Sequence, residues 1–172
     1  MRLPDNLEVL NDLVMSECWA LKEVNIPSKL REIHGVFFSN TKLPSSILVM
    51  PETLEVWDGT SFTGFPSVEE MVIPKNVRVL RDAFWMMEGL RKVTIRTQKL
   101  KEIGDNTFYC CGALEDVNLP EGITRIGQEA FYLNTSLRKI NLPSTLTRIE
   151  YDAFRYDPLE VIDLPAGMTY IG

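Results

Sequence analysis

One motif recurs along the whole chain at a nearly constant interval, and this repetition constrains the fold more than any other feature. An apolar residue followed by proline marks most copies of the motif. The anchors are Pro4, Pro27, Pro51, Pro74, Arg96 in place of a proline, Pro120, Pro143 and Pro165, at intervals of 22 to 24 residues. So regular a period indicates a solenoid, in which each repeat forms one coil and stacks on its neighbours.

The spacing of apolar residues within one repeat predicts its local structure. Ile140 and Leu142 alternate with polar residues before Pro143, whereas Leu146 and Ile149 follow it three positions apart. The alternation predicts a short strand with one buried face, which the proline ends. The second pair fits a turn or a short second strand better than a long helix.

An aromatic residue closes most repeats about eleven positions after the anchor. The members of this series are Phe38, Phe62, Phe84, Phe108, Phe131 and Phe154. The preceding "EA" or "DA" predicts a short helical or 3-10 turn that places the ring in the core. Trp57 and Trp85 are likewise expected to pack inside. The predicted fold is a β-rich solenoid of about seven repeats.

The bulk properties fit one domain over residues 1–172, expected to be a fragment of a longer protein because neither end shows a polar cap. End-to-end self-association is the alternative. No apolar run is long enough to predict a membrane span. The net charge of −6 argues against nucleic acid as the main partner.

Sequence motifs for catalysis, cofactors or metals are not found, so we expect no catalytic, cofactor-binding or metal-binding residues. His34, the single histidine, occupies a position expected to be an exposed turn. Cys18 and Cys111 fall in equivalent positions several coils apart, and Cys110 neighbours Cys111, so we expect buried or half-buried thiols without disulfides. Asn134 satisfies the N-glycosylation pattern, which we interpret as incidental.

Outward-facing strand positions, four and two before each anchor, are mostly polar and form the face that solenoids use for recognition. Apolar residues break this pattern at Ile47, Val49 and Val72, and Val56 and Val79 occupy nearby positions that are charged in other repeats. A local apolar patch predicts a protein contact site. Repeat drift, or a surface covered by missing parts of the protein, would give the same pattern.

A basic stretch is the second candidate for binding. Residues 75–101 contain eight Lys or Arg and only two Asp or Glu, and Arg78, Arg91 and Arg96 are the candidate contact residues. The stretch predicts either a solvated face or a patch for an anionic ligand or partner.

The segments "LRKINLPSTLTRIEYDAF" and "FYCCGALEDVNLPEGITRIGQEAF" closely resemble the BspA-like leucine-rich repeat family, and the likeness extends from Leu3 to Gly172. The resemblance implies a right-handed, β-rich solenoid. Proteins of this type are commonly cell-surface or secreted products of bacteria and some parasitic protists, and some are implicated in adhesion to host matrix proteins or other cells. The family has no active-site motif to transfer.

Two functions follow from these observations. The favoured one is a noncatalytic protein-binding module of a bacterial surface or secreted adhesin-like protein, with a host matrix or cell-surface protein as partner. The rival is an intracellular or structural repeat scaffold that spaces other domains and has no adhesive role.

Overall fold

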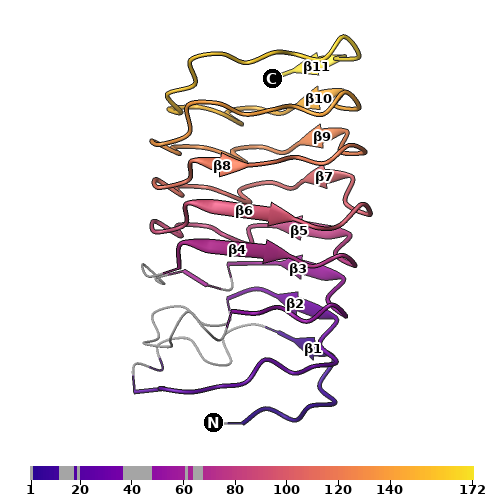
Figure 1. Cartoon of the computed structure of the whole chain (residues 1–172), viewed down its shortest axis with the longest axis vertical. Coiled ribbons are helices and arrows are strands. Elements are labelled where there is room, and N and C mark those ends of the chain that lie inside the picture. The colour runs from indigo at the N-terminus through magenta and orange to yellow at the C-terminus, as the bar shows by residue number, and fades with distance from the viewer. Residues whose placement is uncertain (1, 12–17, 19, 37–47, 61, 64–67) are drawn as a thin grey trace.

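The coils of this protein stack so that short parallel strands form two columns along the long axis (Figure 1). The structure is a computed structural model that describes residues 2–11, 18, 20–36, 48–60, 62–63 and 68–172. Strand pairing joins each coil to its neighbours, since every paired strand lies in a different repeat. The β-rich solenoid predicted from the period is therefore confirmed.

The first column lies after the anchors. Its strands are β1 (Val9–Leu10), β2 (Glu32–His34), β3 (Val56–Asp58), β5 (Val79–Arg81), β7 (Glu102–Ile103), β9 (Arg125–Ile126), β10 (Arg148–Ile149) and β11 (Tyr170–Ile171). They form the parallel sheets β1-β2-β3-β5 and β7-β9-β10-β11. The amide of Gly104 donates to the carbonyl of Leu80 at 2.9 Å and connects the two sheets. The second apolar pair of each repeat thus forms a short strand, one of the two predicted options.

The second column lies before the anchors and contains β4 (Glu70–Ile73), β6 (Lys92–Ile95) and β8 (Asp116–Val117), paired in that order. Isolated pairing between Asn118 and Asn141 continues it. Buried Met71 and Ile73 alternate with exposed Glu70 and Val72, as expected for a strand with one buried face. Pro74 follows directly and ends the strand.

The third side of each coil differs from the prediction. The "EAF" and "DAF" segments form consecutive turns, and no helix occurs in the described ranges. Left-handed backbone conformations recur at equivalent positions, with positive φ at Asp82, Met86, Asn106, Cys110, Glu129, Leu133, Asp152 and Tyr156. These left-handed residues turn alternate amides toward the next coil. The amide of Phe84 donates to the carbonyl of Thr107 at 2.9 Å, and the amide of Met86 donates to the carbonyl of Tyr109 at 2.7 Å. Hydrogen bonds between coils thus replace the bonds that a short helix would make within itself.

The core is a ladder of aromatic rings that runs through the stack. Trp57, Phe62, Phe84, Phe108 and Phe131 are fully buried. The ring centroids of Phe84 and Phe108 lie 5.2 Å apart, those of Phe108 and Phe131 lie 5.0 Å apart, and both pairs are stacked. The core positions expected for these residues are confirmed. Phe38 lies outside the described residues.

A second, half-exposed aromatic row lies beside this core. Trp85 stacks on Tyr109 at a centroid distance of 5.9 Å, and Tyr109 stacks on Tyr132 at 4.9 Å. Trp85 is therefore a packing residue, as expected, but it is half-buried rather than fully inside the core.

Phe131→Ala should destabilise the stack by about 3 to 5 kcal/mol, because the buried ring leaves a cavity between Phe108 and Phe154. Urea unfolding followed by circular dichroism measures the change. Phe154→Ala is the matched control, since Phe154 is only partly buried and should cost less. Equal losses from both variants would contradict the ladder as the main source of core stability.

Asp157 forms a partly buried polar contact with Asn134. Its Oδ1 accepts a hydrogen bond from the backbone amide of Asn134 at 2.7 Å, while its Oδ2 and the Oδ1 of Asn134 are buried without a hydrogen-bond partner among the described residues. Burial raises the pKa of Asp157 to about 7, although the hydrogen bonds from Asn134 act in the opposite direction. Since the side chain of Asn134 is fully buried, the glycosylation pattern does not mark an exposed asparagine.

The raised pKa of Asp157 predicts a stability that falls with rising pH. Between the ordinary pKa of 3.8 and about 7, the folded protein retains a proton that the unfolded chain has released. The free energy of unfolding should therefore decrease across this window. Asp157→Asn mimics the protonated side chain, so its stability advantage over wild type should grow from pH 4 to pH 7 in urea titrations. Asp163→Asn, at an exposed carboxyl in a neighbouring stretch, is the control, and a constant difference between Asp157→Asn and wild type would refute the assignment.

Candidate functional site

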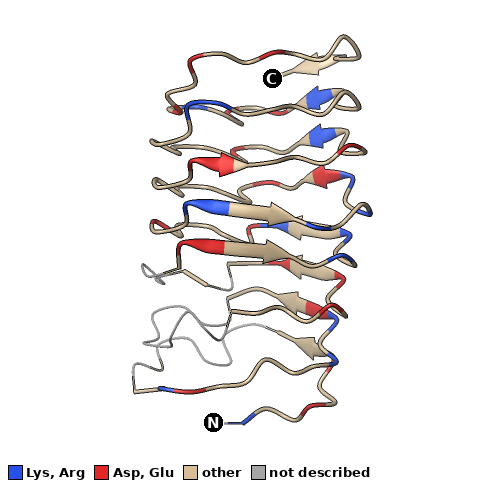
Figure 2. Cartoon of the chain, viewed as in Figure 1, with Lys and Arg blue, Asp and Glu red and all other residues tan. Residues whose placement is uncertain are grey.

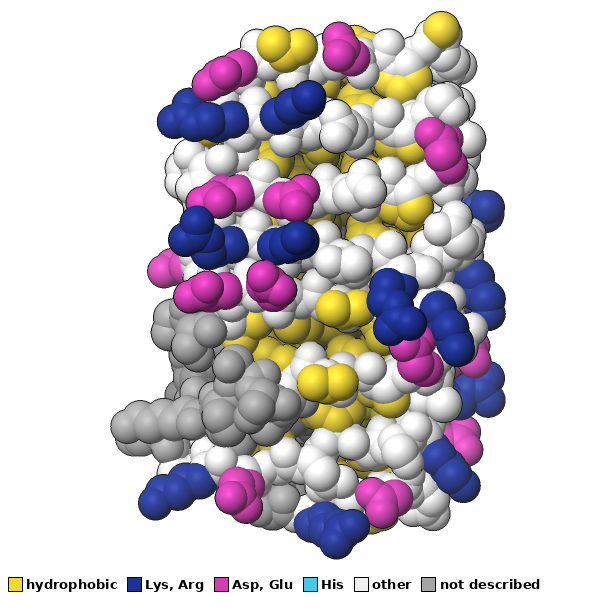
Figure 3. Space-filling view, in the orientation of Figure 1, with side chains coloured by type: hydrophobic (Ala, Val, Ile, Leu, Met, Phe, Trp, Pro, Cys, Tyr) yellow, Lys and Arg dark blue, Asp and Glu magenta, His cyan; other side chains and the backbone are white. Residues whose placement is uncertain are grey.

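A groove opens on the face of the second column, between the coil that contains residues 48–52 and the coil that contains β4. Its volume is about 820 Å³. The groove is lined by Leu48, Val49, Met50, Pro51, Glu52, Val68, Glu69, Glu70, Val72, Pro74 and Arg96. Figure 3 shows hydrophobic side chains gathered in this hollow, beside rows of charged residues on the upper coils. Its size lies within the range of pockets that enclose a ligand.

The apolar walls arise from two equivalent positions in adjacent repeats. Val49 and Val72 each lie two residues before an anchor proline, and their exposed fractions are 78% and 44%. The next coil presents Thr94 at this position, in register with Val72. Leu48, Met50 and Val68 are buried and form the apolar floor of the groove. The pattern break noted in the sequence therefore coincides with a concave surface.

Of the eight residues predicted for binding, the structure brings three together: Val49, Val72 and Arg96 all line the groove. Val56 and Val79 lie opposite one another in β3 and β5 of the first column, where Val56 is buried and Val79 half-buried. They do not line the groove. Ile47 lies outside the described residues.

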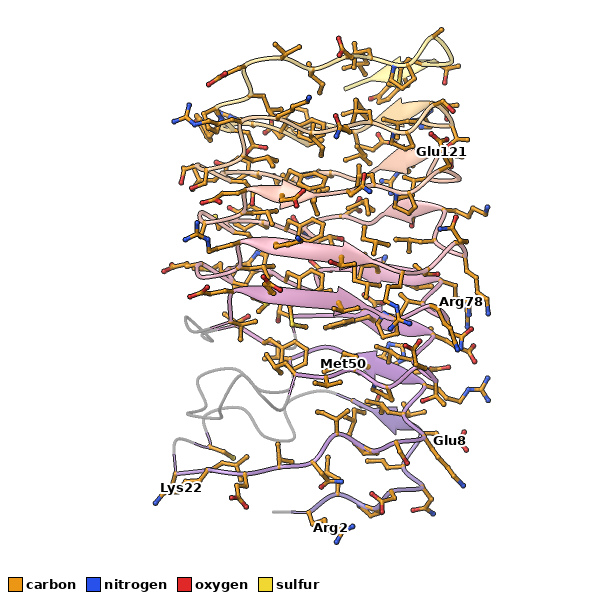
Figure 4. The ribbon with its side chains drawn as sticks, viewed as in Figure 1. Arg2, Glu8, Lys22, Met50, Arg78 and Glu121 are labelled. Carbon is orange, nitrogen blue, oxygen red and sulfur yellow. The ribbon has the colours of Figure 1, made fainter. Side chains whose placement is uncertain are left out.

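The predicted basic residues are paired with acids from other coils, which are adjacent for Arg91 and Arg78 and two coils away for Arg96. Arg96 lies 2.6 Å from Glu52, and Arg91 lies 2.9 Å from Glu115. Arg78, which projects at the side of the stack in Figure 4, lies 3.6 Å from Glu55. A hydrogen bond from Arg31 is the main reason that the pKa of Glu55 is lowered. An anionic ligand would have to compete with these carboxylates for the same cations.

Charges on the second column alternate in sign from coil to coil (Figure 2). Two rows show this alternation, Glu69, Arg91, Glu115, Arg138 and Glu160 in one and Glu70, Lys92, Asp116 and Lys139 in the other. Arg138 lies 3.1 Å from Glu160 and Lys92 lies 3.9 Å from Asp116. Glu69 and Glu70, which end both rows at the groove, form no ion pair with any described residue. These two residues were not singled out from the sequence, because their lack of an ion pair among the described residues becomes visible only when the coils are stacked.

His34 differs from its predicted setting. It ends β2 rather than occupying an exposed turn, and its Nε2 lies 3.0 Å from the Oε2 of Glu32. The first column extends to this position, which explains why the residue is half-buried. In the described part of the chain, no group of three His, Cys, Asp or Glu residues is arranged to hold a metal ion.

The three cysteines are free thiols with different environments. Cys111 is buried, Cys110 half-buried and Cys18 exposed, so the expectation of buried or half-buried thiols is wrong for Cys18. Burial raises the pKa of both Cys110 and Cys111. The Sγ of Cys111 also donates to the carbonyl of Phe84 at 3.0 Å, which places this thiol in the stack between coils.

Among the described residues, no helix is long and apolar enough to cross a membrane.

The family model described as the BspA type leucine rich repeat region, with six copies, matches residues 1–98 and 60–172. These ranges together include the whole chain, and the chain therefore belongs to the BspA type leucine rich repeat family. Six copies agree roughly with the seven repeats expected from the anchors. No curated protein sequence matches the chain.

Two solved structures of bacterial proteins share the fold. A leucine-rich repeat protein from Bacteroides ovatus is 25% identical with a TM-score of 0.73, and the match covers 99% of this chain and 44% of that one. A leucine-rich repeat protein from Eubacterium ventriosum is 15% identical with a TM-score of 0.70, covering 95% and 56%. A leucine rich cell surface protein from Faecalibacterium prausnitzii is 19% identical with a TM-score of 0.43, covering 99% and 58%. The chain spans about half the length of these proteins.

The thiol environments predict a graded reactivity. Cys18 should react first with a disulfide reagent such as DTNB, Cys110 more slowly, and Cys111 only after unfolding, because the thiolate is the reactive form and burial disfavours it. The absorbance of the released thiolate gives the rates. Cys18→Ser should remove the fast phase, and Cys110→Ser, the control, should leave it unchanged. A fast phase that persists in Cys18→Ser would contradict this order.

Proposed function

We propose that this chain is a noncatalytic protein-binding module of a bacterial surface or secreted adhesin-like protein, and that the groove beside β4 is its contact site. The observation that carries this proposal is the pair of exposed valines, Val49 and Val72, in a concavity whose neighbouring coils present mostly polar residues. Concave apolar surfaces on soluble proteins mark contact sites. Membership of the BspA type family supports a surface or secreted location.

The chemistry of the groove favours binding over catalysis. Its polar side chains are Glu52, Glu69, Glu70 and Arg96, and the ion pair between Arg96 and Glu52 occupies two of them. Among the described residues that line the groove there is no serine, cysteine or histidine that could act as a nucleophile or its base. An apolar floor with an acidic rim is a surface for recognising another protein.

The double variant Val49→Asp with Val72→Asp should bind its protein partner at least about tenfold more weakly, because it places two charges where an apolar contact must be desolvated. Binding to a panel of purified extracellular-matrix proteins, measured by biolayer interferometry, tests this. Thr94→Asp is the matched control, since it adds a charge at the equivalent exposed position one coil away from β4.

Circular dichroism melting should show that both variants remain folded, because the substituted side chains are exposed. A partner that binds the double variant and wild type equally would overturn the groove as the contact site. A folded wild-type protein that binds no member of the panel would favour the rival function, a structural repeat scaffold.

A further inference from the structure

The second column of strands ends at β4, although the solenoid continues beyond it. Residues 48–50 occupy the equivalent position in the preceding coil, yet they form no strand and β4 pairs only with β6. On the first column the same coils remain paired, because β3 joins both β2 and β5. The interruption is therefore local to one face, and the groove lies where a strand pairing is absent.

The backbone of β4 presents unpaired polar groups to this groove. Lys92 donates to the carbonyl of Glu69 and Arg96 donates to the carbonyl of Ile73, each at 3.0 Å, so these carbonyls point toward β6. Backbone groups of successive strand residues point to opposite sides, which directs the amide and carbonyl of Val72 toward the groove. Neither group bonds to residues 48–50, and Val72 has no further hydrogen bond within the described chain. An edge of this kind is a template for another strand.

The side chains around this edge define what can pair with it. The floor of Leu48, Met50 and Val68 accepts the inward side chains of an extended segment, and Val49 and Val72 contact its flanks. Glu69 and Glu70 lie at the rim without ion-pair partners among the described residues. On the other coils acidic residues pair with basic residues of an adjacent coil, as Glu115 does with Arg91 and Glu160 does with Arg138. A ligand at β4 would complete the alternation if it carried Lys or Arg.

We propose that β4 binds an extended segment of the partner protein as an additional strand, and that this segment is rich in β-branched residues and flanked by Lys or Arg. The proposal deepens the proposed function and rests on it, because it assigns the partner chemistry of the same groove. Main-chain hydrogen bonds to Val72 supply affinity in this mode, and alternate side chains in the groove supply specificity. The acidic rim selects against acidic segments.

The test uses a fluorescein-labelled peptide of sequence SKVTVTVKS and a depsipeptide analogue in which esters replace the central amides. The analogue keeps every side chain but lacks the N–H donors. Fluorescence anisotropy should show binding of the parent peptide to wild type, and about tenfold weaker binding of the analogue, because a strand pairing with Val72 needs those donors. Hydrogen exchange at the Val72 amide should slow by about tenfold in the saturated complex.

Matched variants separate the contribution of the strand edge at Val72 from that of the acidic residues Glu69 and Glu70. Val72→Asp should abolish binding of the peptide, whereas Thr94→Asp should leave it unchanged. The pair Glu69→Gln with Glu70→Gln should weaken binding about threefold at low salt and reduce its salt dependence. A peptide with Glu in place of both Lys residues should bind wild type more weakly than the parent does.

Several results would overturn the proposal. Equal affinity of peptide and depsipeptide, both lost in Val72→Asp, would leave the groove as a contact site but reject strand pairing. Binding that Val72→Asp does not affect would place the peptide elsewhere. A matrix protein that needs Val49 and Val72, combined with no binding of the peptide, would retain the proposed function and reject this ligand. Dimerisation of the chain in sedimentation experiments, lost in Val72→Asp, would assign the edge to a second copy instead.

Discussion

Contact between successive coils is the interaction on which the rest of this structure depends. A coil of 22 to 24 residues encloses no core of its own, and its strands of two to four residues are too short to form a sheet alone. Stacking resolves both problems, because equivalent backbone groups pair between coils and equivalent rings pack on one another. The buried rings from Phe84 to Phe131 stack from one coil to the next. The backbone amides of the turns do the same, because they donate hydrogen bonds to carbonyls of the next coil.

The periodic part of the fold was predictable from the sequence because stacking requires similar residues at equivalent positions. The apolar positions around Pro74 and Pro143 give the buried face of each coil directly. The third side was not predictable in the same way. Met86, Glu129 and Leu133 adopt left-handed conformations that their residue types rarely adopt. The conformational preferences of these residues therefore do not predict the turns. Hydrogen bonds to the next coil impose these conformations, and such bonds depend on the stack as a whole.

The candidate site was predictable only in part, for a related reason. Val49 and Val72 break a polar pattern, which any comparison of repeats reveals. The groove between them depends on a missing strand pairing at residues 48–50, and those residues have the same alternation as true strands elsewhere. The cations of residues 75–101 form a cluster in sequence, whereas in space they pair with acids from other coils, as Arg91 does with Glu115. Charge counted along a chain is therefore a poor guide to charge on a solenoid face.

The alternating charges of the second column limit how such a protein can grow. Duplication of one coil would place Arg91 beside another Arg91, or Glu115 beside another Glu115, and like charges directly opposite on neighbouring strands are destabilising. Duplication of two adjacent coils preserves the order of signs. The structural repeat of this face is therefore one coil. The smallest segment that can be duplicated without placing like charges side by side is two coils.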